Sequence, residues 1–380
     1  MTRSQEVFLD LLRCGLWGTP LNKAFFGEAN DDRDANSPSN LGKMSALSHE
    51  EWKEVVDIAT DQTVTGLVFD ALLTLPKALR PPKDIYFNQV MRVGEMEEGN
   101  RRMNQMIAFL FQGFAKAGID ALLLKGQAAA RCYPQPLHRQ YGDIDIMIPD
   151  NQGFEKAVKL MQRLTGDEGD AERDWQHVAF VYKGICVEIQ GLNEYSIGRR
   201  CHQNYMEWAR ESLRNGKQQK ISAVLPPVRF EFMFIFVHLM NHFFVGGVGL
   251  RQFCDWMRYL HSMREVIDTA LLKADLERLG LMRHWQTMAS AAVCFLGASK
   301  DVIPFYDASF DRKAPLVMNH IFKSGNFGSL RENIFEGDAT PTVVRRFGTL
   351  LSLIPAYGRV GRLFPADACL SFYRYALRRL

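Results

Sequence analysis

The sequence predicts an α+β fold in which a small mixed sheet is flanked by helical regions on both sides. Three observations support this fold class. Apolar residues keep a helical spacing up to about residue 120, change to a two-residue period between 121 and 190, and return to helical spacing after Pro226-Pro227. We therefore expect an N-terminal helical region (1–83), a core with a long leading helix (84–225) and a C-terminal helical region (226–380).

Composition and net charge limit the classes of protein to which this chain can belong. The chain has 380 residues, of which 47% are hydrophobic and 23% charged, as in a globular protein with a full core. Its 46 Lys and Arg against 43 Asp and Glu leave a net charge of only +3, which argues against binding long nucleic acid. Seven cysteines without a CxxC pair indicate reduced thiols. Because charged residues come early, we expect no secretory signal and a cytoplasmic location.

Two helical segments are expected before the sheet. Ser48-His-Glu-Glu51 is a capping-box pattern that opens an amphipathic stretch through about Leu75. The segment from Asp84 to Ala117 contains no proline and keeps near-helical apolar spacing, which predicts one long helix. The polar, turn-rich segment 30–40 predicts a loop.

The two-residue period defines the strands. Ala121–Leu124 is a short apolar run, and residues 144–148 alternate isoleucine with Asp145 and Met147. Two further runs, 178–182 and 185–190, flank a Lys-Gly pair and predict an antiparallel hairpin. A helix opened by Asp150 should lie between the second strand and this hairpin.

Helical patterns return in the last third of the chain, over 229–244, 251–263, 270–279 and 281–296. The first belongs to a run of 19 residues without Asp, Glu, Lys or Arg, Phe232–Leu250, which contains two histidines and therefore predicts a buried helix rather than a membrane span. The last forty residues hold seven Arg against Asp367 alone. We expect a solvated face or a partner-docking tail there, with contact to a membrane surface as the less favoured alternative.

Two carboxylates stand close together on the second predicted strand. Asp143 and Asp145 are at i and i+2, so their side chains should share one face, with Cα atoms about 6.5 to 7 Å apart. From this spacing both can ligate one Mg²⁺ and share a second ion. The alternative interpretation is an edge strand whose polar face lies in water.

Two further features favour the metal interpretation. The Lys125-Gly126 turn comes before a run of alanines suited to a helix start, so backbone amides and a positive charge could meet phosphate oxygens there. Glu188, on the outward face of a later strand, could complete a metal site or accept the proton of an attacking hydroxyl. Glu188 could equally be a solvent-facing strand residue.

These residues resemble a known family. The Leu-Leu-Lys-Gly turn, Tyr133-Pro134, Arg139 and Gly142-Asp-Ile-Asp-Ile are similar to the uncharacterised bacterial nucleotidyltransferase-like family of the DNA polymerase beta superfamily. The resemblance is strong over the core and looser over the flanking helices, where it includes His242, Arg251 and Asp255. It implies a mixed-sheet nucleotidyltransferase core, metal ligation by Asp143 and Asp145, a third-acid role for Glu188 and triphosphate contact around Gly126.

The sequence departs from the superfamily pattern at three points. Gln127 stands where the superfamily has a phosphate-binding Ser, and the third acid is Glu where Asp is commoner. The connection from the turn to Asp143 is longer than usual, and we expect it to fold over the nucleotide as a stiffened lid. Within it, Arg139 suits a bidentate phosphate contact, or else forms a salt bridge that orders the loop near Asp143.

Two pairs on the later helices carry weaker signals. His238 and His242 lie at i and i+4 but lack the Glu of a zincin motif, so we expect hydrogen-bonded core histidines, with His242 the one that reaches a substrate. Arg251 and Asp255 have the same spacing and predict an ion pair within one helix.

We therefore expect a metal-dependent nucleotidyltransferase that uses two Mg²⁺ or Mn²⁺ ions. It would move a nucleoside monophosphate from an NTP, with ATP favoured, to an unknown small-molecule or protein acceptor. The expected nucleotide-binding residues are Lys125, Gly126, Gln127, Arg139 and His242, and the expected catalytic and metal residues are Asp143, Asp145 and Glu188. Two alternatives remain: an inactive relative that keeps the pocket as a nucleotide sensor or scaffold, which Gln127 favours, and a glycosyltransferase whose Asp-x-Asp holds a nucleotide diphosphate.

Overall fold

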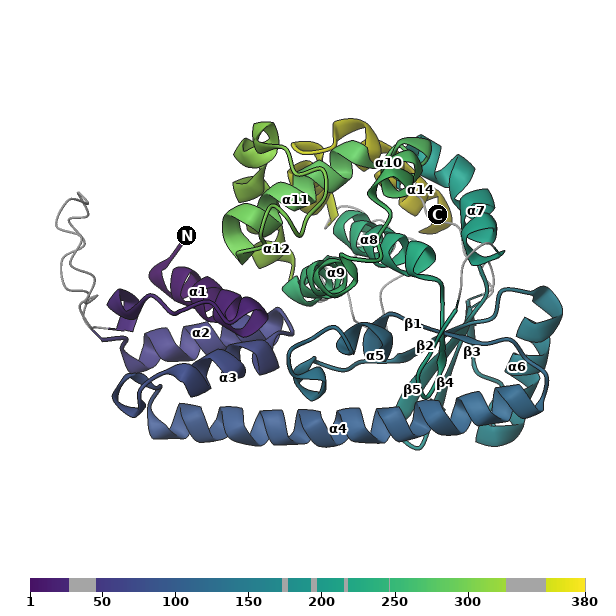
Figure 1. The fold of residues 1–380 in the computed structure, drawn as a ribbon, viewed down its shortest axis with the longest axis horizontal. Coiled ribbons are helices and arrows are strands. Elements are labelled where there is room, and N and C mark those ends of the chain that lie inside the picture. Colours follow the sequence, from purple (N-terminus) through teal and green to yellow (C-terminus); the bar gives the residue numbers. More distant parts are fainter. Residues whose placement is uncertain are drawn as a thin grey trace, which may run out of the picture.

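The computed structural model has the predicted α+β architecture, with one five-stranded sheet among many helices (Figure 1). It describes residues 1–26, 46–172, 177–192, 197–214, 218–245, 247–325 and 353–379. The predicted loop at 30–40, and Arg345 and Arg346 of the basic tail, lie outside the described residues. A long helix runs along one side of the molecule beneath both the N-terminal helices and the sheet.

The N-terminal part holds four helices: α1 (Arg3–Trp17), α2 (His49–Asp61), α3 (Thr65–Thr74) and the long α4 (Lys83–Lys116). The single long helix predicted from Asp84 is confirmed, and Ser48 caps α2 with the predicted reciprocal contacts to Glu51. The prediction of one continuous amphipathic stretch through about Leu75 is wrong, because the chain turns at Gln62 and Thr63 between α2 and α3. The Gln62 amide oxygen accepts from the Leu250 amide at 3.0 Å, a distant contact that fixes this turn.

The main sheet contains β1 (Leu122–Leu124), β2 (Ile144–Met147), β3 (Asp170–Glu172), β4 (His177–Tyr182) and β5 (Ile185–Gln190). Its strand order is β1-β2-β5-β4-β3, with β2 and β5 parallel and every other pair antiparallel. The predicted hairpin is confirmed, and its turn uses positive φ at Lys183 (50°) and Gly184 (76°), as a tight two-residue turn requires. β2 is an interior strand, which excludes the edge-strand interpretation of its carboxylates.

The two faces of the sheet serve different purposes. Ile144, Ile146 and Ile148 pack with residues of α4 and of α6 (Asn151–Thr165), the helix that Asp150 caps as predicted. On the opposite face, apolar residues of β1 and β2 join a second core built from helices of both flanking regions. Asp145 therefore points toward the flanking helices, on the face where a site can be enclosed.

The C-terminal part covers that second face. It comprises α7 (Gly198–Arg214), α8 (Val228–Val245), α9 (Leu250–Met263), α10 (Thr269–Arg278), α11 (Met282–Leu296), α12 (Ala314–Ser324) and α14 (Pro365–Arg379). Short elements complete the description: α5 (Lys125–Ala130), η1 (Lys23–Phe26), η2 (Lys77–Leu79), η3 (Pro136–His138), η4 (Ala308–Lys313), β6 (Gln219–Lys220) and β7 (Val224–Leu225). The four helices predicted after residue 226 are confirmed as α8 to α11.

The apolar α8 is a core helix, as predicted. Phe230, Phe236 and Leu239 have no exposed surface, and the helix packs on α9 and on α14. Over the described part of the chain, no helix combines the length and apolar character that a bilayer span needs. In the basic tail, Leu363 and Phe364 are buried in the core, so part of this segment is structural.

Candidate active site

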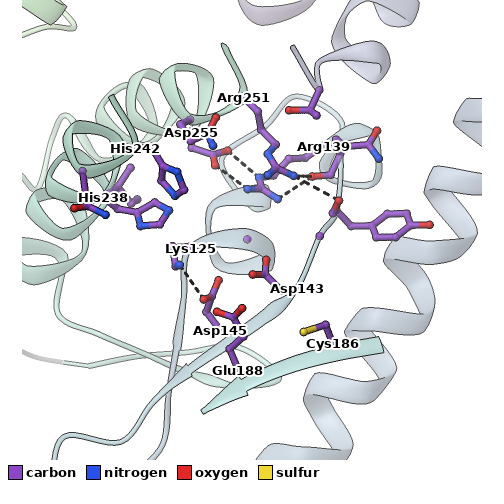
Figure 2. A pocket seen from close by; sticks show the side chains of 18 of the residues that line it. Lys125, Arg139, Asp143, Asp145, Cys186, Glu188, His238, His242, Arg251 and Asp255 are labelled. Atoms are coloured by element: carbon purple, nitrogen blue, oxygen red, sulfur yellow. Dashed lines mark hydrogen bonds and ion pairs between the residues drawn. The ribbon is translucent and has the colours of Figure 1, made fainter. Parts of the chain in front are cut away.

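A cavity of about 810 Å³ lies between the sheet and helices α8 and α9 (Figure 2). Its lining combines acidic residues from β2 and β5, the Lys125-Gly126 turn, and polar side chains of the two helices. The principal lining residues are Lys125, Gly126, Arg139, Asp143, Asp145, His177, Cys186, Glu188, His238, Asn241, His242, Arg251 and Asp255. Seven of the eight predicted site residues are therefore gathered in one place.

The strand register brings the three acids together. Asp145 of β2 lies directly opposite Glu188 of β5, so the two carboxylates share one face of the sheet. Asp143 precedes β2 rather than lying inside it, yet its side chain turns to the same point. One ligand oxygen from each of the three carboxylates lies within 4.8 Å of the others. The predicted meeting of the three acids is confirmed.

Burial and mutual repulsion control the protonation of these acids. Asp145 is only 3% exposed; burial, reinforced by the charge of Asp143, raises its pKa to about 8. Burial also opposes ionisation of Glu188, but a 3.1 Å hydrogen bond with His177 and the charge of Lys125 outweigh it and lower the pKa of Glu188 to about 2. Because the cluster carries excess negative charge, a bound cation would favour release of the proton from Asp145.

The Lys125-Gly126 turn places a positive charge against the acids. The Lys125 ammonium nitrogen lies 2.8 Å from Oδ1 of Asp145. The backbone is strained here, since Lys125 has φ of 42° and Gly126 has φ of 30° with ψ of −112°. Only glycine adopts the second conformation at low cost, which explains the glycine at this position.

The donor set fits a hard divalent cation. Three carboxylates supply the oxygen ligands that Mg²⁺ and Mn²⁺ prefer, and the Lys125 ammonium already sits as a cation against Asp145. Within the described ranges, no other group of three His, Cys, Asp or Glu side chains comes together in this way.

Arg139 forms a salt bridge, which is the second of the two roles predicted for it. Its guanidinium makes a bidentate ion pair with Asp255 of α9, at 2.8 and 2.7 Å, and Asp255 also accepts a 2.6 Å hydrogen bond from Tyr133. This salt bridge orders the loop before Asp143. The prediction of an ion pair between Arg251 and Asp255 is wrong, because the Asp255 carboxylate pairs with Arg139 instead.

The long connection before Asp143 is fixed to neighbouring helices. The Asn100 amide of α4 donates to the carbonyl oxygens of Leu137 and Arg139, and His138 bridges Asp70 of α3 and Glu97 of α4 at 2.6 and 2.9 Å. These contacts stiffen the connection, as predicted, by fixing it to α3 and α4, and its last four residues (139–142) line the cavity. They hold Asp143 at a defined position.

Gln127 lies outside the cavity lining. Its side-chain amide is buried and donates to the Asn100 side chain at 2.6 Å, next to Met103 of α4. The amide therefore points away from the cavity and toward the long helix. A phosphate contact through this side chain does not fit the geometry, so Gln127 is better described as a support for the turn.

His238 and His242 face the cavity instead of being enclosed in the core. Their rings meet edge to face, with centroids 4.4 Å apart, on one wall of the site. Burial, reinforced by the charge of Lys125, lowers the pKa of His242 to about 4 and that of His238 well below its usual value. Both imidazoles are therefore neutral near pH 7 and can exchange hydrogen bonds with a ligand.

Two further residues contribute to the site in ways that the sequence did not predict. His177 orients Glu188, and its position could have been inferred from the hairpin, because the two-residue turn pairs Ala179 with Glu188 and makes His177 a diagonal neighbour. Arg251 lines the cavity, and its guanidinium pairs with no carboxylate in the part of the chain that the structure describes. No local sequence pattern could predict that Arg251 lacks an ion pair with Asp255, because this depends on the pairing of Asp255 with Arg139.

The fold and the site define an α+β protein whose cavity joins three clustered carboxylates with basic side chains, the chemistry of phosphoryl-transfer sites. A protein-family model described as "Uncharacterised nucleotidyltransferase" matches residues 48–297, and the chain belongs to that family. The match extends from the capping box of α2 to the glycine that ends α11 and includes every predicted site residue. No curated protein and no solved structure matches the chain.

Proposed function

We propose that this protein is a metal-dependent nucleotidyltransferase that transfers a nucleoside monophosphate from an NTP, with ATP favoured, to an acceptor outside long nucleic acids. The observation that carries this proposal is the clustering of Asp143, Asp145 and Glu188 within 4.8 Å on the enclosed face of the sheet. Buried carboxylates are costly to assemble unless cations compensate them. Membership of the nucleotidyltransferase family supports the same chemistry.

In this proposal, Asp143 and Asp145 would hold two Mg²⁺ or Mn²⁺ ions, and Glu188 would complete the site or accept a proton. When bound, the ions would neutralise charge on the phosphate oxygens. Lys125 would exchange its contact with Asp145 for a phosphate oxygen, and the phosphates would lie beside the Gly126 turn, which lines the cavity. The neutral ring of His242 would hydrogen-bond the nucleotide.

The reaction is a displacement at the α-phosphorus. An acceptor hydroxyl or amine forms the new bond to phosphorus, the bond to the bridging oxygen breaks, and pyrophosphate leaves with that electron pair. The acceptor proton passes to Glu188 or to solvent. Because the carboxylates and basic side chains are held by an interior strand and pinned loops, positioning and charge stabilisation would supply most of the catalysis.

The cavity is consistent with a small acceptor. Its volume of about 810 Å³ is toward the upper end of the range for small-molecule sites, about 300 to 1,000 Å³. A metabolite or one protein side chain could therefore bind beside a nucleotide. The modest net charge of +3 gives no basis for a long polyanionic acceptor.

The test is incubation with ATP labelled at the α-phosphate, Mg²⁺ or Mn²⁺, and a panel of small hydroxyl and amine acceptors. We expect pyrophosphate release and label transfer to an acceptor by the parent protein, and neither by Asp145→Asn. Nucleotide-dependent protection from thermal unfolding without pyrophosphate release from any NTP would instead favour an inactive sensor or scaffold. Gln127, which turns away from the cavity, keeps that alternative open.

A glycosyltransferase makes a different prediction. A nucleotide sugar with Mn²⁺ would then raise the melting temperature whereas NTPs would not. The third acid opposite Asp145 and the family match favour nucleotidyl transfer over this alternative.

A further inference from the structure

The guanidinium of Arg251 lines the cavity and uses only part of its hydrogen-bonding capacity. Its Nη1 donates to the carbonyl oxygens of Gln140 and Tyr141, at 3.2 and 3.5 Å. Its Nε is buried without a hydrogen-bond partner, and Nη2 has no partner among the described residues. Figure 2 shows the side chain beside the cavity, on the α9 side and away from Lys125.

Arg251 forms no ion pair with a carboxylate among the described residues. Arg139 and Arg251 lie close together, and both donate to the carbonyl oxygen of Gln140, at 3.1 and 3.2 Å. The nearby carboxylate of Asp255 is fully engaged by Arg139 and Tyr133. Asp143 acts on both guanidiniums through its charge without pairing with Arg251, so the Arg251 side chain can still form an ion pair with an anion from outside the chain.

The position of this guanidinium suits a ligand that also reaches the acids. A Cβ placed on Gly142 would lie 3.7 Å from Nη1 of Arg251, and Asp143 is the next residue. Arg251 and Lys125 thus provide positive charge from two directions around the carboxylate cluster. A chain of phosphates is the anion whose charges extend across such a space, with a planar guanidinium able to bind phosphate oxygens in pairs.

We propose that Arg251 binds the polyphosphate of the nucleotide and retains the pyrophosphate that leaves, a role that rests on the proposed function for the identity of the ligand. Arg139 then acts on the ligand only through Asp255 and the loop, as a positioning residue. This reverses the sequence-based expectation, in which Arg139 was to bind phosphate and Arg251 was to form a helix ion pair.

The chain contains a matched control on the same helix. Arg258 is also partly buried and also donates to backbone carbonyls, those of Cys132 and Leu16 at 2.9 and 2.8 Å, but it does not line the cavity. Arg258→Gln removes a comparable structural contact without removing a cavity charge. Arg251→Lys keeps the charge but loses the paired geometry, so it separates charge from shape.

The experiment is titration calorimetry with inorganic tripolyphosphate, once with EDTA and once with Mg²⁺, together with the melting temperature of each variant. We expect the parent to bind in both conditions, Arg251→Gln to bind at least tenfold more weakly, Arg251→Lys to bind with intermediate affinity and Arg258→Gln to bind within twofold of the parent. Absence of binding by the parent, unchanged binding by Arg251→Gln, or equal losses in the two Gln variants would overturn the proposal.

The two proposals fail in different ways. Tripolyphosphate binding could depend on Arg251 while Mg²⁺ has no effect and no pyrophosphate is released from NTPs. This result would support the anion site and contradict the proposed transfer reaction. If NTP turnover is observed but tripolyphosphate binding is insensitive to Arg251, the reaction stands and this inference falls.

Discussion

At the scale of single residues, the surroundings of Asp145 restrict its position and its charge most strongly among the three acids. It is buried on an interior strand, contacts Lys125 at 2.8 Å and lies directly opposite Glu188. A carboxylate in this position gains little from the fold alone, since burial raises its pKa. The cation in the proposed function would offset this cost of burial.

The first prediction concerns this residue. Asp145→Ala should bind Mg-ATP at least tenfold more weakly than the parent, equivalent to about 1.4 kcal/mol, because it loses a central ligand of the cation. Calorimetry with Mg-ATP measures the difference. Glu95→Gln, on the exposed face of α4, is the control and should bind like the parent. Equal binding by Asp145→Ala and the parent would count against the metal assignment.

His138 is a second residue with a clear physical role. It lies between Asp70 and Glu97, and Glu97 also pairs with Arg101. The hydrogen bond with Asp70 raises the pKa of His138, helped by that with Glu97 and opposed by burial. The imidazolium therefore stabilises the fold fully below the unfolded-state pKa of about 6.5, and this contribution is lost as pH rises through the folded-state pKa.

His138→Gln should accordingly lower the free energy of unfolding by about 1–2 kcal/mol at pH 6, and by less at pH 9. Urea unfolding at the two pH values measures the change. His49→Gln removes an exposed contact with Asp84 and should have a much smaller effect at either pH. A loss for His138→Gln that does not shrink at the higher pH would contradict this role.

The sequence identified the acids but not the partners of the basic residues. Asp143, Asp145 and Glu188 could be predicted because strand periodicity and one hairpin turn determine which side chains share a face. Arg139 finds its partner 116 residues away, and Gln127 finds Asn100 in the preceding helix. Such pairings depend on helix packing, for which local spacing gives no rule.

At the scale of elements, the contact between α4 and the loop before β2 determines where Asp143 lies. Gly99 of α4 faces Tyr141, and a Cβ at Gly99 would come within 2.3 Å of the tyrosine ring. The loop therefore packs against the helix only because this position has no side chain. Gly94, five residues earlier on α4, has nothing within 4 Å.

These two glycines provide a matched pair of variants. Gly94→Ala should stabilise the protein by about 0.5–1 kcal/mol, because alanine is the better helix former. Gly99→Ala has the same intrinsic gain but must displace Tyr141, so we expect it to be destabilising and to weaken Mg-ATP binding through the shift of Asp143. Urea unfolding and calorimetry test both expectations. Gly99→Ala behaving like Gly94→Ala would show that the contact does not position the site.

Most elements were predictable because their signals are local. Capping residues and apolar period identified α2, α4 and α6, and the two-residue turn identified β4 and β5. The break between α2 and α3 was missed because it depends on Gln62 contacting α9 across the molecule. The three-residue β3 is an edge strand too short to show a period.

At the scale of the whole molecule, one large core joins the two flanking regions. Residues of α1, α2 and α3 pack in the same cluster as residues of α8, α9 and α11, and β1 and β2 contribute their second face. The cavity lies between this cluster and the sheet. The sequence suggested three consecutive regions, and their shared core could not be predicted because it depends on helix packing between segments far apart in the chain.

The shared core predicts joint unfolding. We expect tryptophan fluorescence and far-ultraviolet circular dichroism to give coincident thermal transitions, because neither flanking region can lose its packing without exposing the other. Mg²⁺ with ATP should shift both transitions together. Two separated transitions, one of them insensitive to the ligand, would show that the regions unfold independently.

The most direct test of the central claim is a crystal structure with Mn²⁺ and a non-hydrolysable ATP analogue, in which anomalous scattering locates the metal. The proposed function predicts Mn²⁺ between Asp143, Asp145 and Glu188, with the α-phosphate beside it and the Lys125 ammonium moved from Asp145 to a phosphate. Nucleotide bound with no metal at these carboxylates, or Mn²⁺ bound elsewhere in the cavity, would contradict it.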